Sequence, residues 1–483
     1  MTFLYIIAAL LASLVILAAA WRTASFRSGN PDRRPYDAGA VDGEKAARSL
    51  SGALQIKTVS NEDYAKTDFA QFNSFLTYLE RTFPGVYAGL EHEMVNTYSP
   101  LFRWKGSDPL KKPVLLMAHY DVVPADPDSE ASWTYPPFSG TIEAGTIWGR
   151  GALDIKCQVI GILEAVESLL KEGYQPQRDI YITFGHDEEV DGQQGARVTA
   201  ELLKQRGMDF EFVLDEGSHI SESILPGIQK PLALIGLCEK GYADVKLLSE
   251  SRGGHSSTPE ADTALSIVCE GVARLHKHPF RSRITPPVKW FLDAVGPEMP
   301  LPGRIALANQ WLFGRAIVRR LSKIPSGNAL FRTTTAATMA GGSLQANILP
   351  QKAWAVINFR LLNGETRKDL ENHIRKVLRG LDIKTEFLIS NDPSAVSQRH
   401  SDAYRAVEKT VLQIFPDVLP APYIMTGASD SIKYEKVSRN IFRFSPYRMN
   451  SADAGKVHGN NECISVRNME DMVRFYKQLI RNV

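Results

Sequence analysis

His119 and Asp121 have the types and spacing of a metal ligand and its support. They follow an apolar run, Val114 to Ala118, which predicts a strand buried on both faces. Polar groups just past the carboxyl end of such a strand lie at the crevice where open α/β sheets bind ligands. The imidazole could ligate a divalent metal while the aspartate holds its other ring nitrogen. A motif this short is also compatible with a loop that only forms local hydrogen bonds.

Two further predicted strands end in carboxylates. The strand predicted over 179–184 leads into Glu188 and Glu189, and the strand over 212–214 leads into Asp215. Asp154 precedes a predicted helix over 159–171, where an aspartate is often only an N-cap. Because three buried strands deliver histidine or carboxylate groups at their carboxyl ends, we expect one shared site at that edge of the sheet.

The collected groups favour a zinc-type centre. Two imidazoles with several carboxylates suit zinc or a related divalent ion better than calcium or magnesium. A carboxylate can bridge two such ions, as in two-metal hydrolases. Hydrolysis also needs a base that is not a ligand, so one of Glu188 and Glu189 would be ligand and the other base. The candidates are His119, Asp154, Glu188, Glu189, Asp215 and His458.

The motifs resemble those of the M20 family of metallopeptidases, which includes carboxypeptidase S, aminoacylase and the N-acyl amino acid hydrolases. The resemblance covers most of the chain after about Ala46. The carboxypeptidase S branch is the most similar, through Asp215 with Gly217 and through the motif His458-Gly-x-Asn-Glu. The other matching motifs are His119-Tyr-Asp, Gly149-Arg-Gly-Ala-Leu-Asp154, Glu188-Glu189, Gly254-His255-Ser-Ser, Asn347 with Pro350, and Arg360.

The resemblance implies two Zn²⁺ ions per chain, with Co²⁺ or Mn²⁺ as alternatives. One ion would be held by His119, Asp154 and Asp215. The other would be held by Asp154, Glu189 and His458, so that Asp154 bridges the pair.

The same resemblance implies catalytic roles. Asp121 would orient His119, and Glu188 would be the general acid and base. His255 would reach the active site of a partner subunit and stabilise the oxyanion there, although a histidine after two glycines can be only a turn residue.

The resemblance also implies a substrate-binding set of Asn347, Arg360, Gly427 and Asp430, which would hold the carboxylate end of the substrate. Arg360 fits this role independently, because a guanidinium can bind a carboxylate through two hydrogen bonds. One departure is Ile155, where the family often has a second acid. We expect a small effect, because the ligand is Asp154.

The predicted fold class is α/β, with a zinc-peptidase-like α/β/α catalytic domain and an inserted, smaller α+β domain. From Tyr242 onward the strands alternate apolar and polar residues, which indicates half-exposed antiparallel strands. The predicted parts are a catalytic domain over 44–241 and 363–483, and a lid and dimerisation domain over 242–362. The resemblance implies a homodimer formed through the lid.

Residues 1–21 predict a membrane anchor, followed by a polar linker over 22–43. The segment Phe3 to Trp21 is about long enough to cross a bilayer, and no Lys or Arg precedes it. A cleaved signal peptide, which would release a secreted or periplasmic protein, is the alternative, because Ala18 to Ala20 fit a cleavage site. The side of the membrane stays open: the arginines after the segment favour a cytoplasmic body, and the signal-like alternative favours the outside.

Within the insert, residues 279–328 are rich in aromatics and proline. Ile305, Ala308, Leu312 and Ala316 could line one helical face, which we expect to be ordinary core. A surface that contacts a membrane or a lipid chain is the alternative.

Composition excludes some functions. The net charge of +2 gives no electrostatic case for a nucleic-acid partner, and the four cysteines include no C-x-x-C pair. The resemblance implies a hydrolase that cleaves the amide bond of small peptides or N-acyl amino acids with a free carboxylate. Alternatives are a hydrolase or synthase for long-chain, lipid-like N-acyl amino acids, and a non-catalytic metal-binding scaffold, which a missing ligand or base would reveal.

Overall fold

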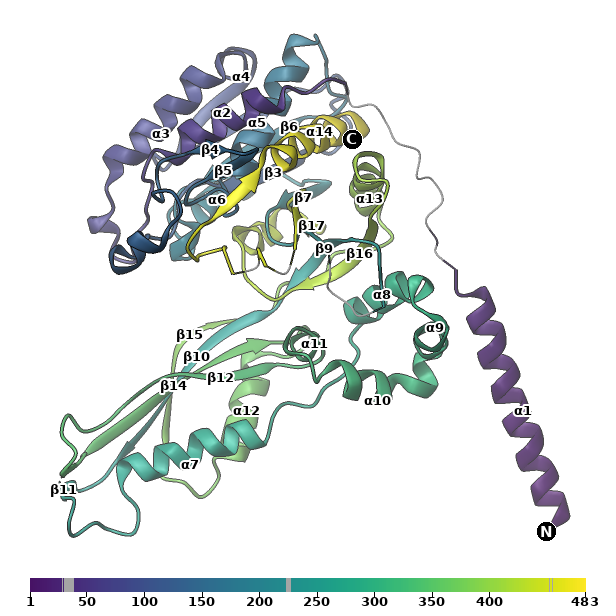
Figure 1. The fold of residues 1–483 in the computed structure, drawn as a ribbon, viewed down its shortest axis with the longest axis vertical. Helices are drawn as coiled ribbons and strands as arrows, with labels where there is room; N and C mark the ends of the chain where they lie inside the picture. The colour runs from purple at the N-terminus through teal and green to yellow at the C-terminus, as the bar shows by residue number, and fades with distance from the viewer. Residues whose placement is uncertain (28, 30–38, 223–226, 451, 454) are drawn as a thin grey trace.

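The computed structural model describes residues 1–483 apart from 28, 30–38, 223–226, 451 and 454. The predicted linker over 22–43 therefore lies partly outside the described residues. A main lobe with a large sheet is joined to a second lobe with a smaller sheet (Figure 1). This is the α/β fold with an inserted α+β part that the sequence predicts.

A ten-stranded mixed sheet forms the centre of the main lobe in the described residues. Its strands are β1 (Glu91–Val95), β2 (Ser99–Trp104), β3 (Val114–His119), β6 (Ile180–Gly185), β7 (Phe212–Asp215), β8 (Ile220–Ser221), β9 (Leu232–Glu239), β16 (Leu419–Met425), β17 (Ile441–Arg443) and β18 (Arg448–Met449). Their order is β1-β2-β6-β3-β7-β17-β9-β8-β18, with β16 paired to β9. Because β3 runs parallel to both β6 and β7, the carboxyl ends of these three strands meet at one edge.

The alternation of side chains along β3 explains why helices cover both faces of the sheet. Leu116 and Ala118 pack into one buried cluster, and Leu115 and Met117 pack into another. The first face is covered by α2 (Gly43–Leu54), α3 (Phe69–Thr82), α4 (Pro84–Gly89), α5 (Lys156–Lys171), α13 (Asp402–Ile414) and α14 (Val466–Asn482). The second face is covered by α6 (Ala196–Gln205) and the 3₁₀ turn η5 (Asp430–Lys436).

The second lobe contains a four-stranded antiparallel sheet in the order β12-β14-β10-β15. The strands are β10 (Gly241–Glu250), β12 (Thr334–Gly341), β14 (Lys352–Leu361) and β15 (Lys384–Asn391). Every second residue of β10 is buried, as its apolar alternation predicts. The buried face packs on α7 (Ala264–Lys277) and α12 (Arg367–Val377).

The sheet pairing extends this lobe beyond the predicted boundary at Leu362. β15 pairs with β10 along most of its length, and Leu370 and Ile374 of α12 lie in the same core. The second lobe therefore continues to Asn391. The sequence did not reveal this, because a helix followed by a strand after Glu365 also fits a return to the main sheet.

The aromatic segment forms four short helices: α8 (Pro286–Val295), α9 (Leu301–Ala308), α10 (Gln310–Leu321) and α11 (Pro325–Phe331). They pack against β9 and β16 at the border of the main sheet. The predicted core stripe is correct for Ala308, which is buried, and wrong for its other three residues, because the helix ends at Ala308 and a new one begins at Gln310. Ile305, Leu312 and Ala316 are consequently exposed, while Leu307 and Ile317 are buried.

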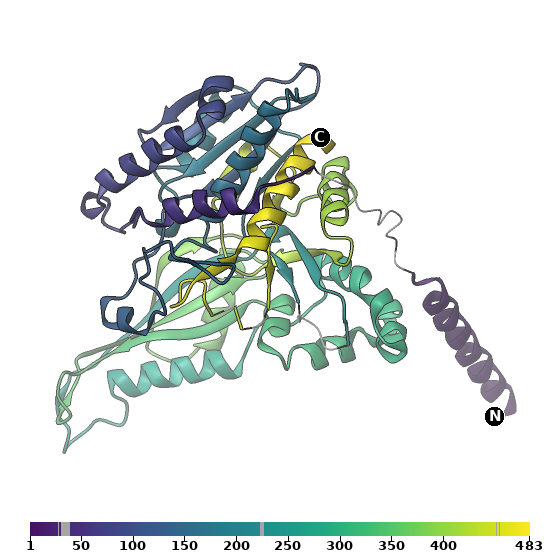
Figure 2. The same ribbon diagram turned by 45° about the horizontal axis from the view of Figure 1, so that its top comes forward.

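Among the residues that the structure describes, one helix, α1 (Thr2–Ser25), is long and apolar enough to cross a membrane. It projects away from both lobes in the two views and meets the body near α9 (Figures 1 and 2). Its bilayer-length window is not buried inside the protein.

Two small sheets complete the architecture. β4 (Ile142–Glu143), β5 (Thr146–Trp148) and β19 (Cys463–Ser465) form one of them, and β11 (Gly254–His255) with β13 (Ile348–Leu349) forms the other. The pairing of β19 with β5 brings the segment around His458 beside the segment around Asp154, although the two are about 300 residues apart. The shorter 3₁₀ turns are η1 (Tyr64–Lys66), η2 (Pro127–Ser132), η3 (Glu188–Val190) and η4 (Gly296–Glu298).

Candidate metal centre

The carboxyl ends of β3, β6 and β7 bring together groups from distant parts of the sequence. His119 is the last residue of β3, and η3 with Glu188 and Glu189 follows β6. Asp154 precedes α5, and His458 lies in a loop before β19. These strand ends and loops bring His119, Asp154, Glu189 and His458 together at one edge of the sheet, as we expected.

Asp154 lies between two candidate ligand groups. One consists of His119, Asp154 and Glu216, and the other of Asp154, Glu189 and His458, with the ligand atoms of each group within 4.8 Å of one another. Asp154 Oδ1 is 3.2 Å from His119 Nε2, and Asp154 Oδ2 is 2.9 Å from His458 Nε2. The two oxygens of one carboxylate therefore face two different imidazoles, which is the arrangement of a bridging ligand.

Glu216 lies in the candidate group around His119, next in the chain to the expected ligand Asp215. Glu216 Oε1 lies 3.7 Å from His119 Nε2. Asp215 shares the sheet face of Val213 and lies beside Ser429, at the start of η5. Asp215 Oδ2 is buried without a hydrogen-bond partner among the described residues, and His119 is close enough to oppose the rise in the pKa of Asp215 that burial causes. Asp215 therefore stays a candidate ligand beside Glu216.

Asp121 supports three members of the cluster at once. Its Oδ1 lies 3.3 Å from His119 Nδ1 and accepts a hydrogen bond from the Glu188 backbone N–H at 3.1 Å. Its Oδ2 accepts one from the Glu189 N–H at 3.1 Å. This fully buried carboxylate can therefore fix the imidazole and the start of η3 together.

The cluster contains more carboxylates than nearby positive charge. Burial, reinforced by Glu216 and Glu189, raises the pKa of Glu188 well above its ordinary value, although His119 opposes the shift. Burial likewise raises the pKa of Glu216, with Asp154 adding to the effect. Hydrogen bonds to Asp154 and Glu189 raise the pKa of His458 to about 10. Added positive charge between the carboxylates would bring each of these pKa values back toward its ordinary value.

The donor set and the unpartnered oxygens fit divalent cations. Glu189 Oε1 is buried and has no hydrogen-bond partner among the described residues. Nitrogen and oxygen donors in two groups that share one carboxylate suit a pair of zinc-type ions.

Glu462 anchors the loop that carries Asp154. Its Oε1 accepts hydrogen bonds from the backbone N–H groups of Leu153 at 2.7 Å and Asp154 at 3.1 Å. Its Oε2 accepts from Arg150 Nη1 at 2.6 Å, while Arg150 Nη2 donates to the His458 carbonyl at 3.2 Å. One buried ion pair thus links the segments of the bridging aspartate and of His458.

A cleft of about 1340 Å³ opens over the cluster and between the lobes. The main lobe contributes Glu188, Glu216 and Gly427, and the second lobe contributes Tyr242 and Arg360. The Arg360 guanidinium stacks on the Tyr242 ring, with its Cζ 4.5 Å from the ring centroid. Arg360 and Gly427 therefore line the same cleft as the metal groups, as their expected roles require.

Three of the residues expected to act on the substrate do not line this cleft. Asp430 is buried behind the wall, where its carboxylate packs against Gly185 and Gly192. His255 is exposed on β11, and the Asn347 carbonyl accepts a hydrogen bond from the nearby Ser256 N–H at 3.1 Å. β11 lies at the far end of the second lobe (Figure 1).

Sequence reasoning missed Glu216, Glu462 and Lys433. The two-residue period of β7 could have revealed Glu216, because Leu214 faces the side opposite to Asp215. Glu462 belongs to the recognised His458 motif, but no local pattern shows its long-range partners. Lys433 lines the cleft with its Nζ 3.5 Å from Asp430 Oδ1, a contact made through η5 that spacing alone does not indicate.

Known proteins are similar in sequence to this chain over most of its length. The sequence model of peptidase family M20/M25/M40 matches residues 115–482. "Probable carboxypeptidase S-like 2" of Dictyostelium discoideum is 39% identical over 448 residues, which cover 90% of this chain and 84% of that protein. The N-fatty-acyl-amino acid synthase/hydrolase PM20D1 of Mus musculus is 38% identical over 442 residues, covering 90% and 87%. Among solved structures, the M20 family metallo-carboxypeptidase Sso-CP2 of Sulfolobus solfataricus matches with a TM-score of 0.65 at 18% identity, over 90% of this chain and 98% of that one.

Proposed function

The chain is a metallocarboxypeptidase-like hydrolase that belongs to peptidase family M20/M25/M40, and we propose that it uses two divalent ions to cleave amide bonds next to a free carboxylate. The observation that carries the proposal is the position of Asp154 between His119 and His458. The scaffold alternative is disfavoured, because a complete ligand set and a candidate base are present among the described residues.

We assign the ligands by geometry. His119, Asp154 and Glu216 would hold one ion, and Asp154, Glu189 and His458 the other. When bound, zinc or a similar ion would supply Lewis acidity and positive charge for hydrolysis at neutral pH. Asp121 holds His119 and the backbone of η3 in place for this arrangement.

Glu188 is the proposed general acid and base. Its carboxylate lines the cleft beside the ligand groups but belongs to neither of them. Burial and nearby carboxylates raise its pKa above the ordinary value of a glutamate, which marks it as a candidate for proton transfer. Glu188 would take a proton from the attacking water and give it to the leaving amine.

The substrate carboxylate is proposed to bind Arg360. Arg360 forms no ion pair with an acidic side chain in the part of the chain that the structure describes, and its guanidinium lies over the Tyr242 ring. A planar guanidinium oriented in this way can donate two hydrogen bonds to a carboxylate. Gly427, which has no side chain, borders the same space.

A long acyl chain is the second candidate for the other end of the substrate. The cleft is larger than most small-molecule pockets, and Val190, Ile389, Met425 and Ile432 contribute apolar lining. The relative from Mus musculus is an N-fatty-acyl-amino acid synthase/hydrolase. These features support testing N-acyl amino acids alongside small peptides.

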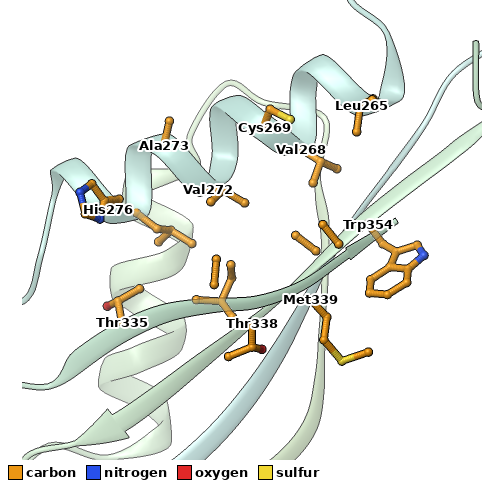
Figure 3. A pocket seen from close by; sticks show the side chains of 15 residues that line it. Leu265, Val268, Cys269, Val272, Ala273, His276, Thr335, Thr338, Met339 and Trp354 are labelled. Atoms are coloured by element: carbon orange, nitrogen blue, oxygen red, sulfur yellow. The ribbon is translucent and has the colours of Figure 1, made fainter. Parts of the chain in front are cut away.

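A homodimer is proposed through the second lobe. β12 is an edge strand, and a hollow of about 580 Å³ lies between it and α7 (Figure 3). Val272, Met339 and Trp354 give this hollow an apolar lining. An exposed apolar edge strand is a ready site for pairing with another chain. In such a dimer, His255 at the tip of the lobe would act in the partner's cleft and Asn347 would accompany it.

Oligomeric state tests the dimer proposal. Met339→Glu should convert a dimer into single chains of 53.6 kDa in light scattering, because it places a charge in the apolar contact. Leu388→Glu is the matched control, since this exposed residue lies on the opposite edge strand, β15. A native chain that is monomeric and fully active would refute both the dimer and the role of His255 in a partner.

The apolar helix α1 supports an N-terminal membrane anchor, with cleavage as a signal peptide as the alternative. Mass spectrometry of the mature N-terminus distinguishes the two. Retention of residues 1–21 in a membrane fraction supports the anchor, and a chain that begins after Ala20 supports cleavage.

The catalytic proposal is tested by Glu188→Gln in the metal-loaded chain. Turnover of dipeptides and N-acyl amino acids should fall by at least about 100-fold while the ions stay bound, because only the proton-transfer group is removed. Glu62→Gln is the matched control, as Glu62 is an exposed carboxylate on the rim of the same cleft. Full activity in Glu188→Gln would contradict the proposed mechanism.

The proposed site for a long acyl chain has a separate test. Equal rates on short-chain and long-chain N-acyl amino acids would contradict such a site.

A further inference from the structure

The exposed side of α9 and α10 combines four large apolar side chains. Leu301 and Trp311 are 56% and 54% exposed, and Ile305 and Leu312 are exposed as well. They come from two successive helices that meet at Asn309 and are in contact with each other. A group of this size on a protein surface usually marks a contact with a partner or a membrane.

The same side of α10 carries three arginines. Arg315 and Arg319 lie four and eight residues after Trp311, and Arg320 lies eight residues after Leu312. These spacings place all three arginines on the exposed side of the helix. None of them forms an ion pair with an acidic side chain among the residues that the structure describes. Tryptophan, leucine and arginine on one helical face are typical of helices that lie at a membrane interface. We call these seven residues the α9–α10 face.

The bilayer-length helix α1 is attached directly to α9. Asn309 Nδ2 donates hydrogen bonds to the Ala19 carbonyl at 3.2 Å and to Thr23 Oγ1 at 3.1 Å, and Arg22 Nε donates to the Ala308 carbonyl at 3.4 Å. The end of α1 that leaves the apolar segment is therefore fixed to the helix that begins the α9–α10 face.

Phe26 strengthens this attachment. Its ring packs so closely on Gly296 that an added Cβ there would lie 2.3 Å from a ring carbon. The helices α8–α10 thus lie where α1 joins the body (Figure 1). With α1 in a bilayer, these helices are the part of the body that its attachment holds nearest the lipid.

We propose that the α9–α10 face rests on an anionic lipid surface. The four apolar side chains would enter the headgroup region, and Arg315, Arg319 and Arg320 would bind lipid phosphates. Charge complementarity and the attachment to α1 both favour a lipid bilayer over a second copy of the chain, which would bring like charges together. The surface would hold the body in a fixed orientation on the membrane.

The full chain in lipid nanodiscs tests this proposal. A fluorescent label on Leu312→Cys should be quenched by brominated lipids in discs that contain phosphatidylserine, and less in discs of phosphatidylcholine alone. Leu110→Cys is the matched control, because residue 110 is fully exposed on a loop of the main lobe and should not be quenched. The parent chain is labelled in parallel to subtract the reaction of Cys269, which is exposed.

A charge variant separates lipid binding from simple proximity to α1. Replacing Arg315, Arg319 and Arg320 by glutamine should lower the equilibrium constant for binding of the α9–α10 face to anionic lipid roughly 100-fold. Each basic residue near an anionic surface raises this constant roughly fivefold. The matched control replaces Arg375, Lys376 and Arg379, which are exposed at the end of α12, and should keep the quenching. Thermal unfolding should be unchanged in both variants.

Two results would overturn the proposal. The first is a label at residue 312 that is not quenched in anionic discs. The second is equal quenching in the arginine variant and in its control.

Discussion

Glu462→Gln should weaken metal binding although Glu462 belongs to neither ligand group. The native carboxylate accepts four hydrogen bonds, at 2.6 Å from Arg150 Nη1, 3.1 Å from the Gly151 N–H, 2.7 Å from the Leu153 N–H and 3.1 Å from the Asp154 N–H. A glutamine keeps one acceptor oxygen and turns an NH₂ group toward two of these donors. Two hydrogen bonds to a charged group are then lost, at about 1.5–3 kcal/mol each.

This loss should appear both in stability and in metal affinity. A total of about 3–6 kcal/mol of stability would be lost, and Arg150 would remain buried without its ion-pair partner. Because the loops of Asp154 and His458 are both tied to this pair, we expect metal affinity to fall by about 10–100-fold. The assay is competition for zinc against a chelator, together with the unfolding midpoint in urea.

Glu164→Gln is the matched control for this experiment. Glu164 is also a buried carboxylate, with hydrogen bonds from Ser49 and Lys45, but it lies within α5 and contacts no ligand. The Glu164→Gln variant should therefore have a lower free energy of unfolding than the native chain and the same affinity for zinc. Metal affinity that is unchanged within about twofold in Glu462→Gln would refute the argument that this ion pair positions the bridging aspartate.

Further predictions concern the ligand choice, acid stability and the substrate carboxylate. Glu216→Gln should remove one ion while Asp215→Asn leaves metal content unchanged, which mass spectrometry of the loaded proteins checks, and the reverse result would restore Asp215 as the ligand. Burial lowers the pKa of His186 from 6.5 to about 4, so the folded state keeps it neutral while the unfolded chain gains a proton below pH 6.5. The contribution of His186 to stability should therefore fall by about 3 kcal/mol between pH 6.5 and 4. Urea unfolding should show a smaller fall for His186→Gln than for the native chain, and an equal fall would exclude His186 as its cause. Arg360→Lys should raise KM for substrates with a free carboxylate more than it lowers kcat, and an unchanged KM would exclude this contact.

Much of the fold could be predicted because buried strands have a strong local pattern. The run Val114 to Ala118 predicted a strand buried on both faces, and β3 lies in the middle of the sheet between β6 and β7. The alternation after Tyr242 predicted a half-exposed strand, and β10 has that pattern. In both cases the period of apolar residues is enough to identify the environment of each face.

The limits of the second lobe and its helices could not be predicted in the same way. The strand over Lys384–Asn391 belongs to this lobe only because it pairs with β10, and pairing partners are not encoded in the strand itself. The apolar stripe through Ile305 and Leu312 was expected to be core, but the break at Asn309 changes the helix axis and exposes both residues. A periodic pattern predicts a face only while one helix continues.

The site was predictable in its position and less so in its details. The strand ends carrying His119 and Glu189 were sufficient to expect a shared metal cluster, because parallel strands end at one edge. The choice between Asp215 and Glu216 depends on which side of β7 each faces at its end. The contribution of Glu462 depends on a loop contact across about 300 residues, which only the folded chain reveals.

Metal content of the native chain and of two variants tests the bridging role of Asp154 most directly. After loading with zinc and removal of free ion, native protein should contain two ions per chain, one for each ligand group. His458→Gln should retain one ion, because only one group is damaged, whereas Asp154→Asn should lose affinity for both. Native protein that turns over substrate fully without bound ions, or Asp154→Asn protein that retains both, would contradict the account.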